Sequence, residues 1–110
     1  MTLDIYYVTL EVIEDIAPSA NKLDRCDPDL ARQLRRAAAS VALNTAEGAY
    51  SQGKNAGARF YSAMASANEV VACLDVARRF GYVAPVEHEV RDKLDRIIAT
   101  LRKLTRRTVR

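Results

Sequence analysis

Apolar residues recur every three or four positions along most of the chain, which is the spacing of helices that bury one face. Between these runs lie residues that typically begin or end a helix. Pro18 ends the first run, Asp27 and Pro28 precede the second, and Gly81 follows the third. The predicted helices cover residues 3–17, 28–48, 55–80 and 85–104.

The helix boundaries predict how the helices are connected. Asp27 can cap free backbone N–H groups, and Pro28 suits a first-turn position whose N–H needs no partner. Gly81 stands where a left-handed residue commonly ends a helix, and we expect Pro85 to open the fourth helix. Only the connection over residues 18–27 is long. We therefore predict an all-α, antiparallel up-and-down four-helix bundle that forms a single domain, residues 1–110.

Alanine is abundant on the inner faces of the predicted helices, so two backbones can approach closely. The predicted core residues of the second helix are Leu30, Leu34, Ala37, Val41 and Leu43. Those of the third are Phe60, Ala63, Met64, Ala67, Val70, Val71, Leu74 and Ala77, and those of the fourth are Val86, Val90, Leu94, Ile97, Ile98, Leu101 and Leu104.

The first helix has two apolar stripes, which indicates two packing partners. One partner is its own bundle and the other is a neighbouring subunit. The first stripe comprises Leu3, Tyr6, Tyr7, Leu10, Ile13 and Ala17. We assign the second stripe to the subunit interface of a homo-oligomer: Ile5, Val8, Val12 and Ile16.

The composition excludes several classes of protein. A chain of 110 residues is long enough for one domain and too short for two. The longest uncharged stretch, residues 37–46, is about half of what a bilayer-spanning helix needs, and the acidic N-terminus does not resemble a secretory signal. We expect a cytoplasmic protein with no membrane role. Cys26 and Cys73 have no further ligand at metal-binding spacing, so we expect no metal site and no cofactor.

The stretch between the second and third helices, LNTAEGAYSQGKNAG, predicts a corner centred on Gly53. If the third helix folds back along the second about Gly53, two residues lie at the same level along the helices when their numbers sum to about 106. Both sets of polar residues then have the spacing of one helical face. The four facing pairs of this polar seam are Glu47 with Arg59, Asn44 with Ser62, Ser40 with Ser66, and Arg36 with Glu69.

Two other interpretations of the seam stay open. Its residues are also the solvated sides that any two amphipathic helices would have. A catalytic role with Glu47 as general base, alone or with Glu69, requires a partner nucleophile or metal that the neighbouring sequence does not supply. His88 is the only histidine, so a Ser/His triad is not expected, and we predict no catalytic residues and no enzyme.

Charge is distributed unevenly although the net charge is only +3. Residues 102–110 carry five basic side chains and no acid, and an antiparallel bundle brings them to the same end as the corner. The opposite end collects Glu14, Asp15, Asp24, Asp27, Asp29, Glu87 and Glu89, together with Lys22, Arg25, Arg78 and Arg79. The predicted basic pole comprises Lys54, Arg59, Arg102, Lys103, Arg106, Arg107 and Arg110.

A basic pole of this kind has two interpretations. Cations favour the C-terminal end of a helix, so a solvated basic tail is one. Contact with the phosphates of RNA or DNA is the other, and it would be salt-sensitive and weakly sequence-selective. Most aromatic residues fall on core stripes, so we do not expect stacking on bases.

Several short motifs carry a resemblance to a known family. They are Gln33-Leu34-Arg35-Arg36-Ala37-Ala38 with Ser40, Asn44-Thr45-Ala46-Glu47-Gly48, Ser66-Ala67-Asn68-Glu69, and Leu74-Asp75. Over residues 30–83 the chain resembles the bacterial four-helix-bundle proteins found in intervening sequences of large-subunit ribosomal RNA genes, which include the accessory protein of diversity-generating retroelements. Thr45 departs from the pattern, since a bulky aliphatic residue is expected there.

The resemblance implies an antiparallel bundle that often assembles as a ring of five. In the retroelement branch it implies a basic scaffold for nucleic acid and a reverse transcriptase. The first hypothesis is therefore a ring-forming, non-enzymatic scaffold that contacts RNA or DNA through the basic pole. The alternative is a homo-oligomeric protein-interaction module with no nucleic-acid role.

Overall fold

The computed structural model describes residues 2–51 and 53–108, with side chains described for residues 4–51 and 55–107. Four helices make up nearly all of the described chain: α1 (Thr2–Cys26), α2 (Pro28–Tyr50), α3 (Gly53–Arg79) and α4 (His88–Thr108). They form an elongated body of 43 × 25 × 19 Å. Each helix packs on its sequence neighbours, and α1 also packs on α4, which closes the bundle. The predicted all-α four-helix bundle is confirmed.

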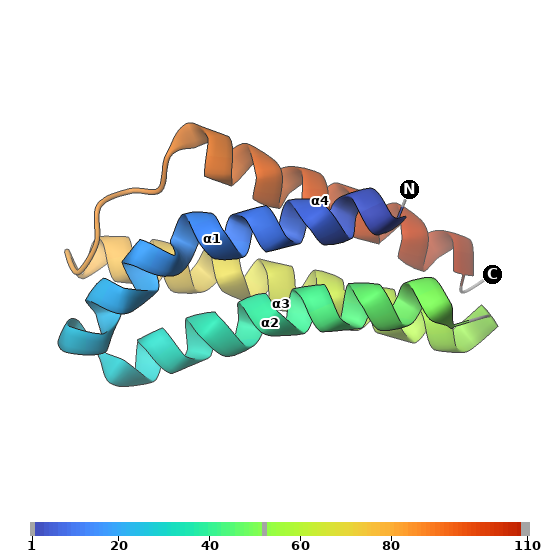
Figure 1. The fold of residues 1–110 in the computed structure, drawn as a ribbon, viewed down its shortest axis with the longest axis horizontal. Helices are drawn as coiled ribbons and strands as arrows, with labels where there is room; N and C mark the ends of the chain where they lie inside the picture. Colours follow the sequence, from blue (N-terminus) through green and yellow to red (C-terminus); the bar gives the residue numbers. More distant parts are fainter. Residues whose placement is uncertain (1, 52, 109–110) are drawn as a thin grey trace.

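The antiparallel order of the helices determines at which end of the bundle the candidate functional residues lie. The two termini lie at the same end of the bundle, and the corner between α2 and α3 lies there too (Figure 1). The α1–α2 corner and the connection between α3 and α4 lie at the other end (Figure 1). The C-terminal turns of α4 therefore share an end of the molecule with the α2–α3 corner, as the sequence predicts.

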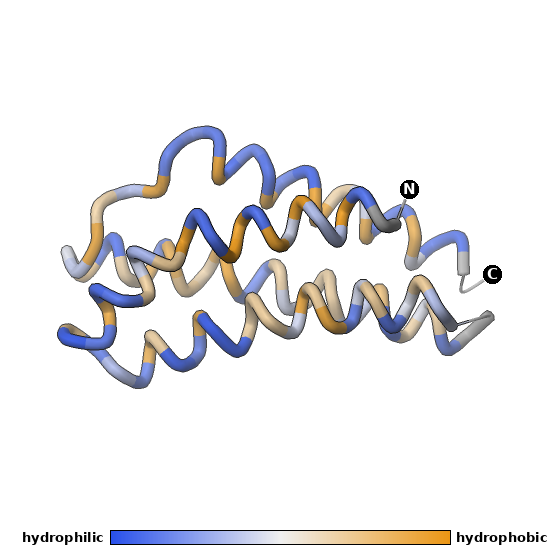
Figure 2. The backbone as a smooth tube through the Cα atoms, viewed as in Figure 1, coloured by the Kyte–Doolittle hydropathy of each residue, from blue (hydrophilic) through white to orange (hydrophobic). Residues whose placement is uncertain are grey.

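The core consists of one continuous set of buried apolar residues from all four helices. Figure 2 shows hydrophobic positions at regular intervals along α1 and α4, separated by hydrophilic ones. Leu34, Leu94 and Leu101 are almost completely buried, as their spacing predicts. The prediction for Leu43 is wrong, because its side chain is 63% exposed. Leu43 follows Val41 by two positions, which carries it to the far side of the helix.

Pro18 does not end the first helix, contrary to the prediction. The helix continues to Cys26, and Asp27 alone separates it from α2. Proline removes one backbone hydrogen bond and crowds the preceding turn, and such sites often bend a helix without ending it. Figure 1 shows α1 changing direction in its second half, toward the start of α2. The continued helix buries Ala20 and Leu23, and this burial offsets the cost of the proline.

The assignment of the two stripes of α1 is also wrong. The residues predicted for the subunit interface, Ile5, Val8, Val12 and Ile16, are buried in the core of the single chain. The other stripe lies farther out: Tyr6, Leu10 and Ile13 are half-buried and Tyr7 is exposed. Both stripes are apolar enough to enter a core, so the hydrophobic pattern alone could not decide between them.

The helix ends follow local rules of capping. The Oδ1 atom of Asp27 accepts a hydrogen bond from the backbone N–H of Leu30 at 3.1 Å, and Pro28 occupies the first turn of α2. Gly81 has φ +76°, and the N–H of Tyr82 donates to the carbonyl of Ala77 at 3.0 Å. This is the glycine C-cap that the sequence predicts.

The fourth helix begins at His88, three residues later than the predicted start at Pro85. The carbonyl of Glu87 accepts hydrogen bonds from the N–H groups of Val90 and Arg91, so the first helical turn forms there. Val83 is buried and Val86 packs against the core, which holds the connection across the end of the bundle.

The packing of Phe60 of α3 against α2 requires the glycine at position 48. A Cβ atom there would lie 2.5 Å from Cε1 and 2.7 Å from Cδ1 of Phe60. These distances are far below van der Waals contact, and Phe60 is itself buried. Gly48 therefore allows the aromatic ring of α3 to lie directly on the backbone of α2.

We expect Gly48→Ala to destabilise the protein. The helical preference of alanine favours the variant by about 1 kcal/mol, whereas overpacking against the ring costs about 1–3 kcal/mol. The measurement is the free energy of unfolding in urea. The control is the same substitution in a Phe60→Leu background, where the clash is relieved and Gly48→Ala should be neutral or stabilising. An equal effect in both backgrounds would contradict this role of Gly48.

Candidate nucleic-acid interface

The structure brings together two of the four predicted pairs of the α2–α3 seam, Glu47 with Arg59 and Ser40 with Ser66. The Nε atom of Arg59 lies 3.0 Å from Oε2 of Glu47, and the hydroxyl oxygens of Ser40 and Ser66 lie 2.8 Å apart. Glu47 and Arg59 are each about half exposed, while the two serines are partly buried. The seam thus has a solvated ion pair near the corner and a shielded hydroxyl pair farther along.

The two other predicted pairs form neither a hydrogen bond nor an ion pair among the described residues. The amide of Asn44 donates to both the carbonyl and the hydroxyl oxygen of Ser40, at 3.0 Å each, and makes no hydrogen bond to Ser62. Arg36 and Glu69 line the same shallow depression as Ser40 and Ser66, without an ion pair. Asn44 therefore supports the serine pair from within α2.

At Thr45 the sequence resemblance predicts a bulky aliphatic side chain. Thr45 is fully buried, and its hydroxyl oxygen has no hydrogen-bond partner among the described residues. A buried hydroxyl without a partner costs about 1–3 kcal/mol. Thr45 therefore fills the space of an aliphatic residue at some expense to stability.

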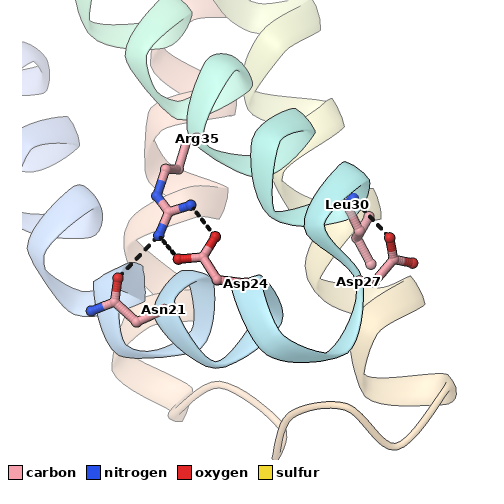
Figure 3. Close-up of polar contacts among 5 residues, drawn as sticks. All are labelled: Asn21, Asp24, Asp27, Leu30 and Arg35. Atoms are coloured by element: carbon pink, nitrogen blue, oxygen red, sulfur yellow. Dashed lines mark hydrogen bonds and ion pairs between the residues drawn. The ribbon is translucent and has the colours of Figure 1, made fainter.

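Arg35 of α2 forms hydrogen bonds to two residues of α1, Asn21 and Asp24 (Figure 3). The guanidinium of Arg35 donates to the two carboxylate oxygens of Asp24 at 2.7 and 2.8 Å, and to the amide oxygen of Asn21 at 3.0 Å. The bidentate geometry matches the planar fork of arginine to a carboxylate. We call Asn21, Asp24 and Arg35 the arginine clasp.

The remaining helix pairs also carry ion pairs. Arg91 of α4 lies 3.2 Å from Asp75 of α3. Lys93 of α4 lies 2.8 Å from Asp15 and 3.4 Å from Glu11, both on α1. These contacts are exposed or partly exposed, so each adds little stability by itself. With the arginine clasp and the two contacts of the seam, each of the four neighbouring helix pairs has at least one polar contact, which favours this arrangement over others.

The pKa values follow from these contacts. The hydrogen bond from Arg35 lowers the pKa of Asp24, and the same bond raises the pKa of Arg35. Hydrogen bonding to Asp15 raises the pKa of Lys93. Burial raises the pKa of Cys73, which leaves its thiol protonated and unreactive at neutral pH.

Four residues of the predicted basic pole form a cluster on the last turns of α4. Arg102, Lys103, Arg106 and Arg107 are exposed, and none forms an ion pair within the described part of the chain. We call these four residues the basic cluster. Arg59 is engaged by Glu47, the side chain of Lys54 lies outside the described side chains, and Arg110 lies outside the described residues.

The helix dipole does not explain the whole basic cluster. Its favourable effect on cations is confined to about the last turn, which contains Arg106 and Arg107. Arg102 and Lys103 lie farther in, and each stands four residues before another cation. Like charges at that spacing destabilise a helix by about 0.2–0.5 kcal/mol per pair. Arg102 and Lys103 thus repel the cations of the last turn, and no ion pair among the described residues offsets this repulsion.

Several aromatic residues are exposed, which the sequence pattern did not predict. Tyr7, Tyr50, Tyr61 and Phe80 all present most of their side chains to solvent, although aromatic residues were expected mainly in the core. Their spacing could have separated Tyr50 and Tyr61 from the core stripes, since neither continues a stripe of its own helix. Phe80 stacks on Tyr82 with ring centroids 5.2 Å apart.

The fold and its surface define an all-α bundle whose helices are joined by matched polar contacts. The last turns of α4 carry cations that form no ion pair within the described residues. The family model of the 23S rRNA-intervening sequence protein matches residues 1–104. The chain therefore belongs to this family, as the motifs in α2 and α3 indicated. No curated protein and no solved structure matches the chain. None of the described helices has the length and apolar composition that crossing a membrane requires.

The arginine clasp predicts a pH dependence of stability. A carboxyl whose pKa is lower in the folded than in the unfolded state, where it is about 3.9, stabilises the fold above that value. This contribution is lost as the pH falls through the lowered pKa. Asp24→Asn should therefore reduce Tm at pH 7, and the difference from the unmodified protein should shrink toward pH 3.

Thermal melts followed by circular dichroism at pH 7, 5, 4 and 3 measure this effect. Asp95→Asn is the control, because Asp95 is an exposed aspartate with no ion pair among the described residues. A Tm difference for Asp24→Asn that stays constant over the whole pH range would show that the charge of Asp24 does not contribute.

Proposed function

We propose that this protein is a non-enzymatic, oligomeric scaffold that contacts the phosphates of RNA or DNA through the basic cluster. The observation that carries the proposal is the contrast between two sets of cations. Arg35, Arg59, Arg91 and Lys93 each face a carboxylate across a helix pair. The basic cluster faces none within the described residues, and α4 has no acid after Asp95.

The arrangement of the basic cluster suits phosphate contacts. Arg102 and Arg106 form one row along α4, and Lys103 and Arg107 form a second row beside it, because residues four apart share a helical face. Arginine can bind a phosphate through two parallel hydrogen bonds. Such contacts neutralise the backbone charge and carry no direct sequence information, so binding should be strong at low salt and weakly selective.

Oligomerisation would increase the affinity of the basic cluster for nucleic acid. Four cations on one chain give weak affinity, and several copies arranged about one axis would bring equivalent clusters to the same side of the assembly. Linked sites then bind with a higher effective concentration. We propose a homo-oligomer, with the ring of five that the family resemblance implies.

A second macromolecule could use the same scaffold. We propose a reverse transcriptase as the partner if the gene lies beside one, and ribosomal RNA as the target if the gene lies within a ribosomal RNA gene. In both settings the protein holds nucleic acid and does not modify it. Glu47, the candidate general base, has Arg59 as its partner, which suits a structural role.

The alternative function is a homo-oligomeric protein-interaction module without nucleic acid. The observation that favours it is the number of large apolar side chains on the surface, including Tyr50 and Phe80. Under this alternative, the basic cluster only complements the dipole of α4 and keeps the protein dispersed.

Removing two cations of the basic cluster should distinguish the two functions. We expect Arg102→Gln with Arg106→Gln to weaken the binding of a labelled RNA duplex at ~50 mM salt. The slope of log affinity against log salt should decrease in magnitude by up to about 2, since each lost phosphate contact accounts for about 0.9. Filter retention or fluorescence anisotropy over a salt series measures both quantities.

Arg25→Gln with Arg78→Gln is the matched control. It removes the same charge from exposed arginines on the last turns of α1 and α3, at the opposite end of the bundle. The control should bind like the unmodified protein. Equal losses of affinity in the two double variants would show that only the net charge of the protein matters. If the unmodified protein retains no RNA at ~50 mM salt, the nucleic-acid function is wrong and the protein-interaction module is the function.

A further inference from the structure

Two exposed tyrosines lie at the same end of the bundle as the basic cluster. Tyr7 of α1 and Tyr61 of α3 are each 59% exposed. Both helices begin at the end of the bundle where α4 finishes, and both tyrosines lie within the first turns of their helices (Figure 1). The reason for expecting no stacking on bases, that most aromatic residues fall on core stripes, does not apply to these two rings.

Tyr61 borders the basic cluster on the side of α3. The contact of Asp75 with Arg91 marks the sides on which α3 and α4 face each other. Tyr61 precedes Asp75 by about four helical turns and Arg102 follows Arg91 by about three, so both stay on these sides. Counted from that contact along the two antiparallel helices, Tyr61 comes level with the turn of α4 that contains Arg102 and Arg106.

Tyr7 borders the basic cluster on the side of α1. The contacts of Lys93 with Asp15 and Glu11 mark the sides on which α1 and α4 face each other. Tyr7 stands four residues before Glu11 and shares its side of α1. Arg107 follows Lys93 by about four turns and shares its side of α4. The basic cluster is therefore flanked by an exposed aromatic ring on each of the two helices that pack on α4.

Both rings suit contact with a flat ligand. Tyr6 packs edge to face on Tyr7, with ring centroids 5.3 Å apart and ring planes at 71°. This contact restricts the Tyr7 ring while more than half of the side chain stays exposed. A tyrosine has only two side-chain torsions, so fixing its ring against a ligand costs little conformational entropy.

Carboxylates are sparse around Tyr61. The chain has no acid over residues 53–68 of α3, and α4 has none after Asp95. On the other side of the basic cluster, Asp4 of α1 lies about one turn before Tyr7. The α3 side is therefore the more favourable one for an anionic ligand, and we expect the larger contribution from Tyr61.

Cations flanked by exposed aromatic rings match the chemistry of an unpaired nucleic-acid strand. Arginine and lysine contact the phosphates of such a strand, and aromatic rings stack on the flat faces of its bases. In a duplex the bases stack on one another, so their faces are not accessible to side chains at the surface. The basic cluster alone would suit either form, whereas the tyrosines gain a partner only in a single strand.

We propose that the basic cluster binds single-stranded nucleic acid, with one base stacked on Tyr61 and another on Tyr7 while the cations between them contact phosphates. The inference rests on the proposed function and names the form of nucleic acid that is bound. Every base has an aromatic face, so the site should accept many sequences. Stacking involves the base and not the sugar, so RNA and DNA strands should both use the site.

An abasic strand separates the two kinds of contact, because it has the phosphates of a single strand without its bases. Fluorescence anisotropy measures the affinity for three labelled probes of equal length: an oligoadenylate RNA, its DNA counterpart and an abasic DNA strand. The unmodified protein should bind both base-bearing strands at least about fivefold more tightly than the abasic strand.

Tyr61→Ala should remove most of this preference and leave the affinity for the abasic strand unchanged, because only the stacked base loses its partner. Tyr7→Ala should have a smaller effect of the same kind. Measured affinities for all three probes give the preference of each variant.

Tyr61→Phe and Tyr50→Ala are the matched controls. Tyr61→Phe keeps an aromatic ring and should bind like the unmodified protein. Tyr50 is 84% exposed and belongs to α2, which lies diagonally across the bundle from α4. Tyr50→Ala should therefore leave all three affinities unchanged. Circular dichroism should show the same helical content in every variant, because the substituted side chains are on the surface.

The outcomes separate the inference from the proposed function. A loss of affinity of Tyr61→Ala for the abasic strand as well would show that Tyr61 acts through folding or assembly and not through stacking. Equal affinity of the unmodified protein for base-bearing and abasic strands would overturn the single-strand inference and leave the phosphate contacts in place. No binding of any probe at ~50 mM salt would show that the proposed function itself is wrong.

Discussion

The close antiparallel packing of α2 on α3 is the constraint on which the rest of the bundle depends. Gly48 lets the ring of Phe60 rest on the helix backbone, and the hydroxyl pair of Ser40 and Ser66, 2.8 Å apart, can form only in one register. Because α3 begins almost directly after α2, this register turns the chain at the corner. It thereby sets which end of the molecule receives the last turns of α4 and which surface of α3 stays uncovered.

Polar contacts fix the relative positions of the helices along the bundle axis, which apolar packing alone does not determine. Alanine-rich faces can slide or rotate against one another with little change in buried area, whereas a carboxylate and a guanidinium must meet at a defined level. The arginine clasp, Arg91 with Asp75, and Lys93 with Asp15 fix the level of the other three helix pairs. These contacts engage the cations at the helix pairs, whereas the basic cluster makes no ion pair within the described residues.

Much of the architecture followed from the sequence, because helix ends and the α2–α3 corner have local chemical causes such as the cap at Asp27 and the turn at Gly81. The predictions from the sequence were wrong at positions whose structure depends on tertiary packing. Pro18 is tolerated because the turns beyond it bury Leu23. The inner stripe of α1 was misassigned because both stripes are apolar, and the exposure of Leu43 became visible only once its neighbours were in place. The seam could be predicted in register because polar residues on two helices matched over several turns.

Disulfide trapping across α2 and α3 tests the register most directly. With Cys26→Ser and Cys73→Ala as background, Ser40→Cys and Ser66→Cys place two thiols where the hydroxyls lie 2.8 Å apart, within reach of a disulfide. Mild oxidation should give an intramolecular bond, seen by mass spectrometry and faster migration on a non-reducing gel. Ser40→Cys with Ser62→Cys, displaced by one turn, should remain reduced. Free thiols in the first pair, or equal oxidation of both pairs, would contradict the register and the placement of α4 that follows from it.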